Sequence, residues 1–100
     1  MSDAVDPLAK LTVGDFEPRT GETFRLLATP ELALKLHEVQ RIGQALRAGG
    51  GFSLHFVAPP GPYLPQAIYP IDHPALGTLH IFITPIGPLA GGNGYEAVFT

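Results

Sequence analysis

The sequence predicts a mostly β domain of about six short strands, arranged as a small antiparallel barrel or a two-layer sandwich with one short N-terminal helical turn. Eleven prolines and twelve glycines in 100 residues are too many for a helical bundle and suit short strands joined by turns. Several segments alternate apolar and polar side chains. Residues 52–57 show this most clearly, with Phe52, Leu54 and Phe56 on one face.

The segment 64–87 is predicted to be the hairpin around which the chain is organised. Its arms are residues 67–72 and 78–84, and the connection between them has turn chemistry. Pro74 fixes its own φ, and Gly77 can adopt a positive φ without steric cost. Such hairpin-like connections favour antiparallel pairing throughout the domain.

The chain length fits one domain with a single core. We expect residues 1–10 to be a flexible N-terminus and residues 11–100 to be a single β domain. Thr12 and the carboxylate three residues later resemble a capping box, so a short helical turn is expected there. Leu11 and Phe16 would then pack on the sheet.

Residues 30–48 have two interpretations. Thr29 and Pro30 form a good helix start, and Gly49 suits a helix end, so local signals favour a helix. The alternative is a strand with alternating leucines, in which a change of phase at residues 37–39 would be a β-bulge.

Composition argues against several classes of function. The net charge is −3 with no basic cluster, so a nucleic-acid partner is not expected. The chain has no cysteine, which excludes disulfides and thiol-ligated metals. No apolar run is long enough to span a membrane, and the N-terminus lacks the apolar region of a signal peptide. We therefore expect a cytoplasmic protein.

Five sequence patterns resemble an uncharacterised family of bacterial domains of about this length. They are GETF at 21–24, FSLxF at 52–56, LPQxxY at 64–69, HPxxG at 73–77 and YEAVF at 95–99. The likeness covers residues 11–100. The resemblance implies a strand over residues 31–41. We expect the remaining residues, 42–51, to form a loop that ends in three glycines. It also suggests an accessory or structural component of a phage-tail-like assembly, by association alone.

No residue set predicts catalysis or a metal site. His55, His73, His80 and Asp72 are suitable ligand types, yet their spacing matches no metal motif. Ser53 lies within a strand and lacks a nucleophile elbow. We therefore predict no catalytic residue, no metal and no cofactor.

A hypothetical ligand or enzyme site would centre on the hairpin. Its candidate residues are Gln66, Tyr69, Asp72, His73 and His80. The structural alternatives are that Gln66 clamps the loop backbone and that His73 bonds the backbone of its turn. Tyr69 and Tyr95 are expected to have buried rings with hydroxyls at the core edge.

The second hairpin arm is apolar on both faces. One face carries Leu79, Ile81 and Ile83, and the other carries Phe82 and Ile86. We expect Phe56 and Phe82 in the core, with the second face covered by the N-terminal turn or by another subunit. The leading functional hypothesis is a non-enzymatic domain that acts through protein contacts, with Phe82 and Ile86 at the interface and a protein partner or a second copy bound there.

Overall fold

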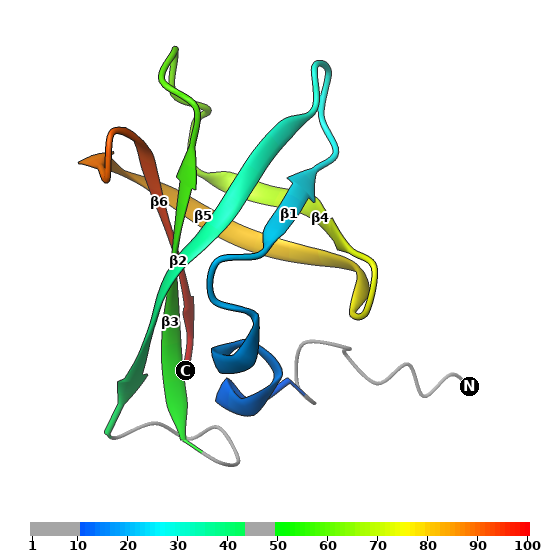
Figure 1. Cartoon of the computed structure of the whole chain (residues 1–100), viewed down its shortest axis with the longest axis vertical. Helices are drawn as coiled ribbons and strands as arrows, with labels where there is room; N and C mark the ends of the chain where they lie inside the picture. The colour runs from blue at the N-terminus through cyan, green and yellow to red at the C-terminus, as the bar shows by residue number, and fades with distance from the viewer. Residues whose placement is uncertain (1–10, 44–49) are drawn as a thin grey trace.

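The computed structural model describes residues 11–43 and 50–100, which form a closed barrel of six antiparallel strands (Figure 1). In chain order the strands are β1 (Thr23–Leu26), β2 (Leu32–Ile42), β3 (Gly51–Ala58), β4 (Ala67–His73), β5 (Gly77–Leu89) and β6 (Gly92–Phe99). Around the barrel their order is β1-β2-β3-β6-β5-β4. Among residues 11–22, two short 3-10 turns, η2 (Val13–Asp15) and η3 (Glu17–Arg19), precede β1. The expected mostly β fold is confirmed, in its barrel form.

The long strand β2 decides between the helix and the strand interpretation of residues 30–48. Leu36 pairs with Phe56 and Glu38 pairs with His55, so His37 is the extra residue of a β-bulge. The strand interpretation and its bulge are confirmed, and the helical alternative is wrong over β2. Pairing with β1 on one side and β3 on the other outweighs the local helix signals.

Strand lengths differ from the predictions at two connections. The expected loop 42–51 is shorter, because Ile42 ends β2 and Gly51 begins β3; residues 44–49, like residues 1–10, lie outside the described chain. Strand β5 is longer than the predicted arm 78–84, because residues 85–89 continue it and β6 already begins at Gly92. Prolines are tolerated there because the pairing of β5 with β4 ends at Ile83, which leaves one side of β5 without ladder hydrogen bonds to donate.

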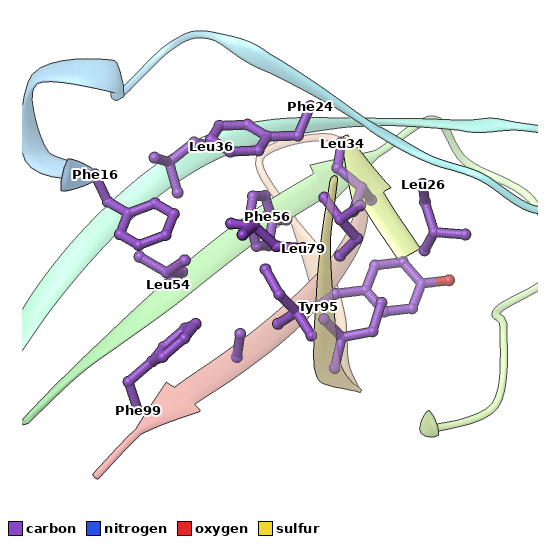
Figure 2. Packing of buried hydrophobic residues seen from close by; sticks show 14 of the residues in the cluster. Phe16, Phe24, Leu26, Leu34, Leu36, Leu54, Phe56, Leu79, Tyr95 and Phe99 are labelled. Atoms are coloured by element: carbon purple, nitrogen blue, oxygen red, sulfur yellow. The ribbon is translucent and has the colours of Figure 1, made fainter. Parts of the chain in front are cut away.

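The N-terminal turn fills one end of the barrel. It begins after Thr12, whose backbone N–H donates to the Asp15 carboxylate at 2.8 Å, as the capping-box pattern predicted. Phe16 is fully buried, with ring-centroid distances of 5.6 Å to Phe52 and 5.9 Å to Phe99. Figure 2 shows its ring directed into the apolar cluster. The turn therefore completes the core.

Strand β5 sends its two apolar faces in opposite directions. Leu79, Ile81 and Ile83 are buried in the barrel, whereas the side chain of Phe82 is 51% exposed. The expectation of a core Phe82 is therefore wrong, although Phe56 is fully buried as predicted. The physical reason is strand alternation: the N-terminal turn packs on the barrel end and leaves the outer face of β5 uncovered.

Candidate functional site

The predicted ligand-binding residues of the hairpin do not converge on one site. Tyr69 and His73 share the inward face of β4, because they alternate with the fully buried Ile71. Asp72 and His80 point outward, on β4 and β5 respectively. The sheet itself separates the two pairs, so the geometry does not favour a single pocket formed by all four side chains.

Both ring nitrogens of His73 are held by contacts within the fold. The backbone N–H of Ala75 donates to Nδ1 of His73 at 3.0 Å. The other ring nitrogen lies 2.7 Å from a carboxylate oxygen of Glu22. The ring also packs against the Phe24 ring in a tilted arrangement, at a centroid distance of 4.6 Å. His73 therefore links its own turn to the segment before β1, and the predicted bond to the turn backbone is confirmed.

Asp72 is held on the outer surface by two donors. The Thr78 hydroxyl donates to one carboxylate oxygen at 2.9 Å, and Arg25 donates to the other at 3.0 Å. These hydrogen bonds, led by that of Thr78, hold the pKa of Asp72 below its ordinary value. The carboxylate is therefore already engaged in joining β1, β4 and β5.

The loop between β3 and β4 is clamped by residues other than Gln66. The Gln66 side chain is exposed and makes no hydrogen bond within the described residues, so the predicted clamp is wrong. Instead, Tyr69 donates its hydroxyl proton to the Pro65 carbonyl at 2.6 Å, and the Tyr95 hydroxyl accepts from the Leu64 N–H at 2.9 Å. Two tyrosine hydroxyls therefore make the backbone bonds that were predicted for Gln66.

Large apolar side chains gather on the outside of the hairpin. Ile68 of β4 pairs directly with Phe82 of β5, and their exposed fractions are 64% and 51%. Ile86 on β5 and Val98 on β6 are also exposed. Sequence analysis identified Phe82 and Ile86 as interface candidates but missed Ile68 and Val98, although the alternation along each strand was the available signal.

Charge is distributed unevenly over the barrel. From residue 48 to residue 100, Asp72 and Glu96 are the only charged side chains among Asp, Glu, Lys and Arg. Both are partnered, Asp72 by Arg25 at 3.0 Å and Glu96 by a ring nitrogen of His55 at 3.0 Å. Consequently β3, β4, β5 and β6 present an outer surface almost without free charge. We call the part of the outer face of β4 and β5 formed by Ile68, Phe82 and Ile86 the uncharged face; Asp72 and its partner Arg25 lie outside it.

Two clefts lie elsewhere on the barrel. The first, of about 280 Å³, lies beside Lys35 on the outer face. The second, of about 300 Å³, lies between the β1–β2 connection and the loop after β3. Neither is lined by Gln66, Tyr69, Asp72, His73 or His80. An apolar cleft is present, but not where the hypothetical ligand site was expected.

Residues 11–43 and 50–100 contain no cluster of three His, Asp or Glu side chains suited to a metal ion. No helix in this same part of the protein has the length and hydropathy needed to cross a membrane. Fold and surface together define a small closed antiparallel β-barrel domain with one apolar, uncharged outer face.

The chain belongs to the family described as Domain of unknown function (DUF6916), whose model matches residues 11–99. The family resemblance found in the sequence patterns is thereby confirmed. Neither the curated proteins nor the solved structures contain a match to the chain.

Proposed function

We propose that this domain is a non-enzymatic protein-contact module whose uncharged face binds the same face of a second copy. Such a symmetric pair would serve as a building unit of a larger, phage-tail-like assembly. The observation that carries the proposal is the directly paired Ile68 and Phe82, both more than half exposed on adjacent strands. Exposed apolar clusters of this kind mark contact surfaces.

The charge distribution supports a second copy as the partner. The charged residues of the described chain are concentrated on β1, β2 and the N-terminal turns, as Lys35 and Glu38 illustrate. Pairing through the uncharged face keeps those surfaces apart, so the net charge of −3 on each copy opposes association only weakly. A two-fold axis also lets each Phe82 contact apolar side chains of the other copy.

Barrel closure supports contact through side chains. An open sheet can bind a partner by adding a strand to its edge, but the six strands here close on themselves. Pairing with β4 ends at Ile83 on one side of β5, but Pro85 and Pro88 beyond it lack a backbone N–H, so we expect association through the outer face. The partner surface must be apolar because neither Ile68 nor Phe82 offers a side-chain hydrogen bond.

Light scattering during size-exclusion chromatography tests the proposal. The wild-type chain should elute with twice its 10.6 kDa mass at micromolar concentrations. Phe82→Lys should elute as a monomer, because the contact would bury an unpaired ammonium group. Ala33→Lys is the matched control, with the same new charge on exposed β2, and should remain a dimer. A wild-type monomer across the micromolar range would overturn the proposal.

A further inference from the structure

The second cleft is built from two segments at one end of the barrel. Ala28, Thr29 and Pro30 of the β1–β2 connection form one wall with Leu32, and residues 59–62 form the other with Leu64. Figure 1 shows both connections at the end opposite the N-terminal turns. The volume of about 300 Å³ is at the lower end of the range of small-molecule sites, which begins at about 300 Å³.

The loop wall is rigidly held from behind. The Asn93 side-chain amide donates to the Gly61 carbonyl at 2.7 Å, and the Tyr95 hydroxyl accepts from the Leu64 N–H at 2.9 Å. Asn93 is only 8% exposed and Tyr95 is fully buried. Three prolines in residues 59–62 further restrict the backbone. The cleft is therefore preformed, and a ligand would bind without first ordering this wall.

The cleft walls have few hydrogen-bond donors and no charge. None of the nine lining residues is charged, and four of them are prolines, which lack a backbone N–H. The Leu64 N–H is used by Tyr95, and the Ala28 N–H donates to the Leu26 carbonyl. Thr29 and Gly61 each keep a backbone N–H, and Thr29 adds a hydroxyl that can donate or accept, but the backbone carbonyl oxygens of the nine lining residues outnumber these donors. The remaining surface is apolar.

We propose that this cleft binds a small neutral aromatic molecule that carries one N–H or O–H donor. The proline rings and Leu32 pack against the aromatic ring, and a wall carbonyl accepts the donor proton. A neutral ligand is required because the cleft contains no group that would pair with a charge. This inference goes beyond the proposed function, since it concerns different residues at a different part of the barrel.

Titration with indole, followed by amide shifts in ¹H–¹⁵N spectra of the full chain, tests the proposal. Saturable shifts should be largest at Ala28, Thr29, Gly61 and Leu64, with a dissociation constant of about 1 mM. The probe 1-methylindole has the same ring without the donor. It should bind about fivefold more weakly, because one hydrogen bond is lost.

Two variants locate the site. Ala28→Leu fills the cleft and should reduce the shifts at least about fivefold, whereas Ala33→Leu, outside this cleft, should leave them unchanged. If Ala28→Leu does not fold, Pro62→Ser, at an exposed wall position, should weaken binding instead. Absence of shifts up to the solubility of indole, shifts centred on Phe82, or equal binding of 1-methylindole would each overturn the proposal.

Discussion

Ile68 and Phe82 stand directly opposite each other on β4 and β5, and both side chains point to solvent. A cross-strand apolar pair of this type normally covers a core. Here the core lies on the other side of the same strands, where Ile71 and Ile81 are buried. The hairpin therefore has apolar side chains on both faces, and only the inner face is used by the barrel itself.

This arrangement predicts different stability effects for two phenylalanines. Phe56→Ala should lower the free energy of unfolding by about 3–5 kcal/mol, because it leaves a cavity in the packed core. Phe82→Ala should change it by less than about 1 kcal/mol, because half of the ring is already hydrated. Urea unfolding at protein concentrations at which light scattering shows the wild-type chain to be monomeric checks both values, because dimer formation would add to the wild-type stability. Equal losses for the two variants would show that Phe82 contributes to the monomer core.

The close approach of β6 to the end of β3 predicts that Gly92 cannot be replaced. A Cβ atom at Gly92 would clash with the Ala58 carbonyl oxygen and with the Val57 side chain. The backbone would have to move, so Gly92→Ala should destabilise the fold by about 3 kcal/mol. Gly43→Ala is the control, since a Cβ there meets nothing within 4 Å. Similar melting temperatures for Gly92→Ala and the wild type would contradict the close approach.

Asp72 predicts a pH-dependent contribution to stability. Its hydrogen bonds with Thr78 and Arg25 lower its pKa in the folded state. A lowered carboxyl pKa stabilises the fold above the unfolded-state value of about 4, and the contribution is lost as the pH falls through the folded-state pKa. Asp72→Asn should therefore have a lower urea midpoint than the wild type at pH 7. The difference should shrink below pH 4; a gap independent of pH would refute this account.

The sequence predicted the strands and the family because both depend on local patterns. Alternation identified β3 and the inward face of β5, and the phase change near His37 indicated the bulge in β2. The length of β5 was underestimated, because Pro85 and Pro88 normally end strands. The part of β5 that contains these prolines pairs with β6 on one side only. Strand pairing is a non-local property, so the local sequence does not reveal it.

The surface was less predictable than the core. Phe82 was expected in the core because a large apolar ring is usually buried, although the alternation of β5 places it on the face opposite Leu79, Ile81 and Ile83. Gln66 was given the clamping role that Tyr95 and Asn93 perform, since their approach to the loop depends on how β6 pairs with β3. The scarcity of charge after residue 48 was visible in the sequence, but its location on one side of a barrel was not.

The most direct test of the symmetric contact uses a single cysteine, since the chain has none of its own. Ile86→Cys places one thiol in the uncharged face while keeping Ile68 and Phe82, and Ala33→Cys places one on exposed β2 as the control. A short bis-maleimide at low micromolar protein should convert Ile86→Cys mainly to a covalent dimer and leave Ala33→Cys monomeric. Equal cross-linking of the two variants, or no cross-linking of Ile86→Cys, would contradict a dimer formed through this face.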